Sequence, residues 1–342
     1  MRLKAKIIKA QVGFTLVELM ISLVLGLIVV GGVISVFLAT QQSYRTNQAL
    51  SEVQDNSRTA FEFLARDIRD AGLTGCGNTG RVANVLNNSP TGGGTDWWAN
   101  WGNALIGYDN GVVDPAVTIG TAVGQRVSAT DSIEIIGAEN SGLSVFAQND
   151  TQANFKLNET TSNLQKGDII MVCDPDHAVI LQITDYNNST VTLVHNTGNS
   201  VSPGNCSKGM GYPTVCTTNG TGYTFGENSQ IAQLAASDWY IGNNPVGGRS
   251  LYQISLANTG GNVAPSAPQE IVRNVTDMQI GYLLEGATSF VSAASVGSGN
   301  WGNVDAVQVT LTLQSSDQRA GTDVKPLTRQ YTTTITLRNR VS

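Results

Sequence analysis

The stretch KIIKAQVGFTLVELMISLVLGLIVVGGVISVFLAT, which runs from Lys6 to Thr40, decides most of what the sequence implies. From Leu19 to Ala39 it contains 21 consecutive residues without a charge. As an α-helix rising about 1.5 Å per residue, such a run is about 30 Å long and matches the hydrocarbon core of a bilayer. The sequence therefore predicts a membrane-spanning helix near the N-terminus. A carboxylate, that of Glu18, lies at its start and needs an explanation.

The charges on either side predict the orientation of this helix. Four basic residues precede it, and the first basic residue after it is Arg45. Because positive charge tends to remain on the cytoplasmic side, we expect a cytoplasmic N-terminus and an exported C-terminal part. That part is long enough to form a sizeable core.

The composition excludes several classes of function. The chain has 20 Lys and Arg against 26 Asp and Glu, a formal net charge of −6, which argues against a nucleic-acid partner. It has only two histidines and no G-x-S-x-G, phosphate-loop or H-E-x-x-H motif, so we expect neither an enzyme nor a cofactor. Low charge and abundant Gly, Asn, Ser and Thr favour an exported, β-rich domain.

Two common interpretations of the N-terminal run are a secretory signal peptide and a plain membrane anchor. A signal peptide has an apolar region of about 7–15 residues followed by small residues at the cleavage site. Here the run is longer, and it ends Phe37-Leu38-Ala39, with the bulky Phe37 as the third residue from the end. A plain anchor fits the length, but a lone carboxylate in a membrane helix costs about 2.5–3.5 kcal/mol on insertion scales. Neither interpretation accounts for Glu18.

The segment GFTLVEL, which ends at Leu19, resembles the class III signal of type IV pilins and pseudopilins. In that family a prepilin peptidase cuts after the glycine and methylates the new N-terminal amine. The resemblance implies cleavage between Gly13 and Phe14, with residues 1–13 as the leader peptide. It also implies that Glu18 pairs with the N-terminal amine of a neighbouring subunit and so serves assembly.

Helical spacing continues beyond the apolar run as far as Gly72, a plausible C-cap. Apolar residues recur at steps of three or four, and Ser57 alone interrupts them. We expect one helix, with residues 14–39 as its transmembrane or filament-core half and residues 40–72 as its amphipathic half. The residues of the apolar stripe are Leu50, Val53, Ala60, Phe61, Leu64, Ile68 and Ala71.

Residues 73–342 change to the period of two that is typical of β-strands, and we expect them to form a periplasmic globular domain. Residues 77–125 and 257–268 are rich in Gly, Asn, Ser and Pro and are predicted to be loops. The predicted fold class is α+β, a long N-terminal helix packed on an antiparallel sheet with long loops. Strands are expected within residues 132–137, 167–174, 177–195 (two strands joined near Asn187), 277–284, 304–313 and 330–339.

Four later segments resemble PilW-type minor pilins: FEFLARDIRDAGLTGCG from Phe61, GDIIMVCDPDHAVILQIT from Gly167, VTDMQIGYLLEG from Val275, and TTTITLRNR near the C-terminus. The resemblance implies a type IV minor pilin that primes pilus assembly at or near the tip and supports twitching motility. It implies as partners the prepilin peptidase, other minor pilins, the major pilin and a tip adhesin. The implied location is the bacterial inner membrane, with a periplasmic domain, and then the pilus.

Two alternatives stay open. The first is a J-like pseudopilin of a type II secretion system, which has the same kind of signal. Glu18 argues against the K type, which lacks an acid at this position. The second is a membrane-anchored periplasmic enzyme or lectin, which the shortage of histidine and of nucleophile motifs disfavours.

Four cysteines in an exported domain are expected to form disulfides, with three possible pairings. The short loop from Cys206 to Cys216 favours that pair, which would leave Cys76 for Cys173.

Two polar or aromatic clusters need an interpretation. Asp174, Asp176 and His177 are metal-ligand types, but Asp-Pro-Asp is typical of a turn, so we expect no metal. Trp97, Trp98 and Trp101 are either an exposed binding patch or a small core under a loop, and we slightly favour the core.

Overall fold

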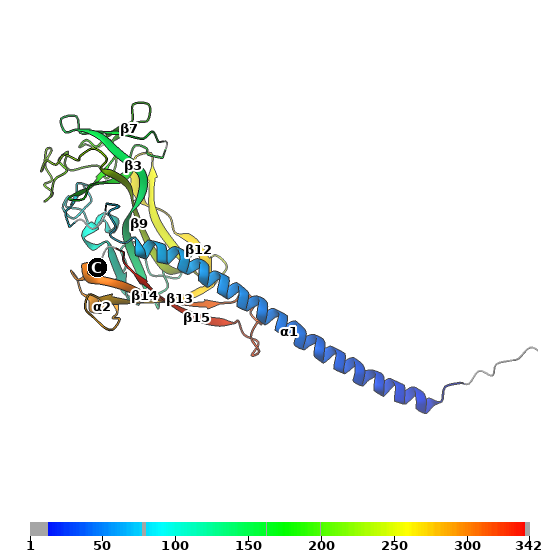
Figure 1. Cartoon of the computed structure of the whole chain (residues 1–342). Coiled ribbons are helices and arrows are strands. Elements are labelled where there is room, and N and C mark those ends of the chain that lie inside the picture. The colour runs from blue at the N-terminus through cyan, green and yellow to red at the C-terminus, as the bar shows by residue number, and fades with distance from the viewer. Residues whose placement is uncertain (1–12, 77–79, 162, 199, 339–342) are drawn as a thin grey trace, which may run out of the picture. The chain divides into compact units, whose positions relative to one another are not determined.

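The computed structural model describes residues 13–76, 80–161, 163–198 and 200–338 (Figure 1). A long helix, α1 (Leu16–Arg69), is followed by strands and short helical turns, α2 (Ala293–Val296), η1 (Trp97–Ala99), η2 (Trp101–Asn103) and η3 (Trp301–Asn303). The strands are β1 (Val82–Asn84), β2 (Leu105–Tyr108), β3 (Ser132–Asn149), β4 (Asn154–Leu157), β5 (Ile169–Cys173), β6 (Ala178–Gln182), β7 (Asp185–Asn187), β8 (Thr192–Val194), β9 (Gln230–Asn243), β10 (Arg249–Thr259), β11 (Asn262–Pro265), β12 (Gln269–Arg273), β13 (Val275–Leu284), β14 (Val304–Gln314) and β15 (Thr328–Thr336).

The chain divides into two compact units, and α1 contributes to both. The first unit contains α1 up to Glu52 together with residues 315–327, the connection between β14 and β15. In this unit the side chain of Gln42 donates to three successive carbonyl oxygens, those of residues 319–321, at 3.1 to 3.2 Å. Thr46 donates to the carbonyl of Ala320 at 2.6 Å. These bonds hold the connection on the middle of the helix.

The second unit begins with the last part of α1, from Val53, and contains the β-strands. The stripe predicted from helical spacing is buried here: Val53, Leu64 and Ile68 are fully inaccessible and belong to the main hydrophobic core. Ser57, which interrupts the stripe, is also buried, and its hydroxyl donates to the carbonyl of Gln54 at 2.9 Å. The serine therefore keeps its place in the packed face because its polar group is satisfied within the helix.

Two sheets form the rest of the second unit. The larger sheet has the order β1-β6-β5-β9-β3-β4-β8-β7, with β10 also beside β9, β11 and β12 beside β10, and β2 beside β3. The smaller sheet has the order β13-β14-β15. All of these pairs are antiparallel except β1 with β6. The observed fold is α+β, a long apolar N-terminal helix followed by a largely antiparallel β domain.

The alternating segments were predicted well, and β13, β14 and β15 lie where period two placed them. Residues 177–195 form three strands instead of two, because β6 pairs with β5 whereas β7 pairs with β8. The two segments predicted to be loops contain short strands: β1 and β2 lie in residues 77–125, and β11 lies in residues 257–268. Those predictions were wrong at these short strands: β1 pairs with the distant β6, whereas β11 forms a hairpin with the preceding β10.

Strands β9 and β10 were not predicted. The second half of β9 is buried almost without interruption, with β3 on one side and β10 on the other. A strand covered on both faces loses the alternation by which half-buried strands are recognised. The structure also joins Cys76 to Cys173 and Cys206 to Cys216 by disulfides, the two pairs named from the sequence.

Candidate functional site

The first turn of α1 holds Glu18 in a reciprocal set of hydrogen bonds. The backbone N–H and the hydroxyl of Thr15 both donate to Oε2 of Glu18 at 3.0 Å. The backbone N–H of Glu18 donates in return to Oγ1 of Thr15 at 3.3 Å. Because Leu16 is the first helical residue, this arrangement is a capping box, which satisfies N–H groups that have no partner in the helix. The carboxylate also lies at the positive end of the helix dipole.

Sequence reasoning placed Glu18 correctly at the start of the helix but missed Thr15. The signal was present, because Thr-Leu-Val-Glu has the S/T-x-x-E spacing of a capping box. The carboxylate is therefore not without partners in the isolated subunit. Both residues lie after the predicted cleavage point, so removal of residues 1–13 would leave this arrangement in place.

The bond between Gly13 and Phe14 lies just before this capped turn. Both residues are exposed, Phe14 to 86%. A Cβ atom added at Gly13 would meet nothing within 4 Å. The packing of the chain therefore does not require glycine at this position.

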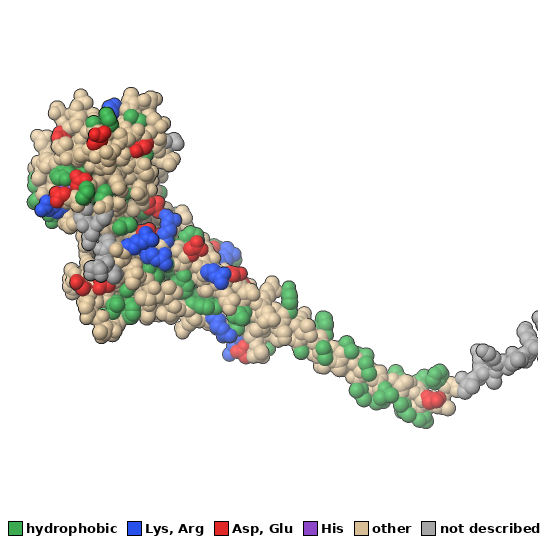
Figure 2. All heavy atoms as spheres, viewed as in Figure 1, with side chains coloured by type: hydrophobic (Ala, Val, Ile, Leu, Met, Phe, Trp, Pro, Cys, Tyr) green, Lys and Arg blue, Asp and Glu red, His purple; other side chains and the backbone are tan. Residues whose placement is uncertain are grey.

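Between Leu19 and Ala39 the surface of α1 is apolar on every side apart from two serines. Every residue from Gly13 to Thr40 is exposed, and Figure 2 shows apolar side chains along this part of the helix. Among the described residues, α1 is the helix long and apolar enough to cross a membrane. Ser22 and Ser35 donate their hydroxyls to helix carbonyls at 2.6 and 2.8 Å. These polar groups therefore need no water, as a lipid environment demands.

The sequence candidates for a metal site form a turn. Oδ1 of Asp174 accepts the backbone N–H groups of Asp176 and His177 at 2.9 and 2.8 Å. Its other oxygen accepts the hydroxyl of Tyr223 at 2.7 Å, and His177 Nε2 lies 2.6 Å from the carbonyl of Met210. Within the described ranges no group of three or more His, Cys, Asp and Glu side chains could hold a metal ion. The contacts of Asp174 are those of a turn.

The tryptophan cluster belongs to a small core. Trp97 and Trp98 are buried in a cluster with Ile136 and Met171, and Trp101 packs partly buried against it. The alternative of an exposed binding patch does not fit Trp97 and Trp98.

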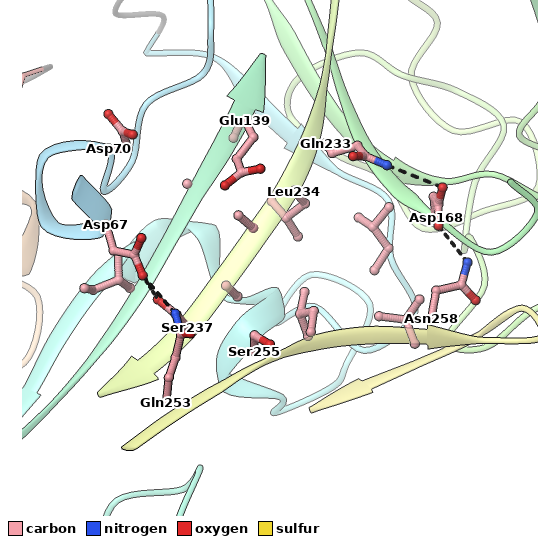
Figure 3. Close-up of a pocket in the computed structure, with 18 of the residues that line it drawn as sticks. Asp67, Asp70, Glu139, Asp168, Gln233, Leu234, Ser237, Gln253, Ser255 and Asn258 are labelled. Atoms are coloured by element: carbon pink, nitrogen blue, oxygen red, sulfur yellow. Dashed lines mark hydrogen bonds between the residues drawn. The ribbon is translucent and has the colours of Figure 1, made fainter. Parts of the chain in front are cut away.

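A pocket of about 370 Å³ opens in the second unit beside the end of α1 (Figure 3). Asp67 in its wall accepts hydrogen bonds from Ser237, Trp239 and Gln253 at 2.8 to 3.2 Å. Burial raises the pKa of Asp67, and the bonds from Trp239 and Ser237 oppose that rise. These contacts tie the end of the helix to β9 and β10.

The other carboxylates of this pocket also have partners in the chain. Glu139 forms an ion pair with Arg66 at 2.6 Å. Asp168 accepts from Asn258 at 2.7 Å. The described lining contains no His, Cys, Lys or Tyr side chain. The pocket is thus a hydrogen-bonded junction between helix and sheet.

Comparison with protein-family models gives two matches. Residues 8–34 match the prokaryotic N-terminal methylation motif. Residues 238–338, from the end of β9 to just beyond β15, match type IV pilus-assembly protein W. No curated protein and no solved structure matches the chain significantly.

Proposed function

We propose that this chain is a minor pilin that primes pilus assembly at or near the tip. Its two family matches support a type IV minor-pilin-like protein. The observation that carries the proposal is that both matches lie in one chain. The methylation motif covers the start of an exposed apolar helix, and the minor-pilin match covers the C-terminal part of the β domain. The function is therefore structural, and we propose no catalytic activity.

We propose that a prepilin peptidase cuts between Gly13 and Phe14 and methylates the new amine of Phe14. The exposure of this bond supports access by an enzyme. A side chain at position 13 would meet no other atom, so packing does not require glycine there. This supports the proposal that the peptidase is what requires glycine at this position. Before processing, the apolar helix would hold the chain in the inner membrane, with the second unit in the periplasm.

We propose that Glu18 acts when subunits join. In the isolated chain it accepts two hydrogen bonds from Thr15, which are neutral donors. A neighbouring subunit would offer the positive amine of its Phe14, and charge-assisted hydrogen bonds are roughly twice as strong as neutral ones. The gain on exchanging neutral for charged partners would favour bundling of the apolar helices with other minor pilins and the major pilin.

A priming or tip position is supported by the size of the β domain. A globular unit of this length, repeated at every step of a thin filament, would be difficult to accommodate. A few copies at one end avoid that crowding. A tip adhesin is the partner we propose for the exposed end of such a complex.

Two measurements test the proposal. Mass spectrometry of the native protein should find an N-methylated Phe14 start, and a chain that retains residues 1–13 would refute processing. Deletion in the host should abolish surface pili and twitching while enzyme secretion continues. The opposite pattern, with secretion lost and pili intact, would favour a J-like pseudopilin of a type II secretion system.

A further inference from the structure

Three acidic side chains meet inside the second unit, beneath the connection that joins β2 to β3. Glu134 on β3 and Asp238 on β9 lie directly opposite each other in the antiparallel register, so their side chains share a face of the sheet. Asp114 comes from the connection, residues 109–131. All three are buried, with exposed fractions of 3%, 0% and 3% for Glu134, Asp238 and Asp114.

The carboxyl oxygens of this cluster have too few donors. Neither Oδ1 nor Oδ2 of Asp238 has a hydrogen-bond donor among the described residues, and the same is true of Oε1 of Glu134. The other oxygen of Glu134 accepts the hydroxyl of Tyr108 at 2.8 Å. The carboxyl of Asp114, which accepts from the Ser132 hydroxyl and the Ala116 backbone N–H, is an electrostatic neighbour of both Asp238 and Glu134. Buried carboxyls that lack donors are more stable with a proton, because a protonated carboxyl carries no charge and can itself donate a hydrogen bond.

Among the described residues, Arg126 is the guanidinium that faces this cluster, and its hydrogen bonds go elsewhere. Arg126 is fully buried in the connection, where its two terminal nitrogens donate to backbone carbonyls at 2.6 to 3.2 Å. Those carbonyls belong to residues 108, 109, 112 and 130, so the arginine holds the connection in its folded path. Its charge could balance one of three ionised carboxylates. The remaining two negative charges would be buried without a counterion, which is strongly unfavourable.

Two phenols lie beside the cluster, those of Tyr108 on β2 and Tyr240 on β9. Tyr252 on β10 is a neighbour of Tyr240, and Asp131 and Tyr282 are neighbours of Arg126. The connection also packs on this face through Val117, which lies in a buried cluster with Tyr240, Tyr252 and Ile254. The charge state of the three carboxyls therefore bears directly on how firmly the connection is held.

We propose that Asp114, Glu134 and Asp238 form a proton-sharing carboxyl triad, a lock that holds residues 109–131 on the sheet and releases them when its protons are lost. The proton is the cation that such a site can take, since within the described residues no acidic group has the arrangement of a metal site. The connection is thereby a segment whose attachment depends on pH.

The direction of the pH dependence follows from burial. Burial, and then the neighbouring Asp114, raises the pKa of Glu134 to about 8. Burial, with Asp114 and Glu134 as neighbours, raises the pKa of Asp238 well above its ordinary value. In the released state these carboxyls lose their protons above their ordinary pKa values, about 4.3 for Glu and about 3.9 for Asp, whereas the folded state keeps them. The connection is thus fully attached at low pH. As pH rises towards the folded pKa, the equilibrium constant for its release increases about tenfold per pH unit for each retained proton.

The test measures when Arg126 becomes accessible to trypsin in the full chain in detergent micelles. Cleavage after Arg126 requires release of the connection, whereas Arg319 is exposed and reports the activity of trypsin itself. The ratio of cleavage at Arg126 to cleavage at Arg319, followed by mass spectrometry, should rise at least tenfold between pH 7 and pH 9, because Glu134 alone accounts for about tenfold and Asp238 adds to it.

The double variant Glu134→Gln with Asp238→Asn replaces the shared protons with amide donors, so its ratio should be the same at both pH values. Asp185→Asn, at an exposed carboxyl on β7, is the matched control and should keep the rise of the unmodified chain. If the double variant does not fold, Glu134→Gln alone should show a smaller rise than the unmodified chain. An unmodified chain with no rise, or variants that keep the full rise, would overturn the proposal.

Discussion

At the residue scale, the position of Glu18 follows from two needs that a single carboxylate meets. Its carboxylate accepts the backbone N–H of Thr15 in the capping box, and it carries the charge proposed for pairing between subunits. These roles predict different mutant behaviour, because one depends on hydrogen-bond acceptance and the other on charge. Thr15 is a matched probe, since it takes part in the cap and is uncharged.

Glu18→Ala is expected to be processed normally but to enter pili poorly, because it removes the charge. Thr15→Ala removes the cap alone and should cost about 1 kcal/mol of helix stability with nearly normal incorporation. Immunoblots of sheared pili, with processing followed by mass spectrometry, would measure both. Equal loss of incorporation in the two variants would mean that capping, and not charge, is the function of Glu18.

Gly13→Val is expected to block cleavage, because it replaces the glycine of the proposed cleavage site. The fold should not change, because a side chain at this position would meet no other atom. Gly26→Ala, at another glycine with open space around it, should be processed normally. The mass of the purified chain distinguishes the two states by the weight of the leader. Normal cleavage of the valine variant would rule out the assigned site.

At the scale of elements, α1 changes character along its length. Its first part is exposed, and its last part, from Val53, contributes fully buried residues to the main core. The backbone is helical in both parts, and the type of side chain determines whether a part is exposed or packs in the core. Within the last part, burial depends on the face of the helix: Leu64 is fully buried, whereas its neighbour Phe63 is partly exposed.

Leu64→Ala is expected to lower the free energy of unfolding of the second unit by about 2–5 kcal/mol, since Leu64 is fully buried. Phe63→Ala should have a much smaller effect, because Phe63 is 46% exposed. Urea titration of the full chain in detergent, followed by tryptophan fluorescence, measures the difference. Similar midpoints for the two variants would contradict the packing described for α1.

At the scale of the whole molecule, the two disulfides close loops of very different length. Cys76 and Cys173 are separated by 97 residues, whereas Cys206 and Cys216 are separated by 10. The longer loop restricts the unfolded chain more, because the entropy of loop closure grows with loop length. The first disulfide is therefore the more important for the β domain.

Replacing Cys76 and Cys173 by serine is expected to cost about 4–5 kcal/mol of stability, against about 2–3 kcal/mol for Cys206 and Cys216. Thermal unfolding of the two double variants, compared with the oxidised chain, gives the order. A larger loss for the Cys206–Cys216 variant would show that native-state contacts, and not loop length, dominate.

The N-terminal helix, its apolar and amphipathic halves, the methylation motif and the strands β13 to β15 can be recognised from the amino-acid sequence. Each has a local period or a short motif, so neighbouring residues suffice to recognise it. The pairing of β9 with β3 and β10, the tryptophan core, and the proximity of Asp114, Glu134 and Asp238 are visible only in the folded chain. These depend on segments that are far apart in the chain and become neighbours only when the sheet forms, and burial there overrides the usual preference of carboxylates for water.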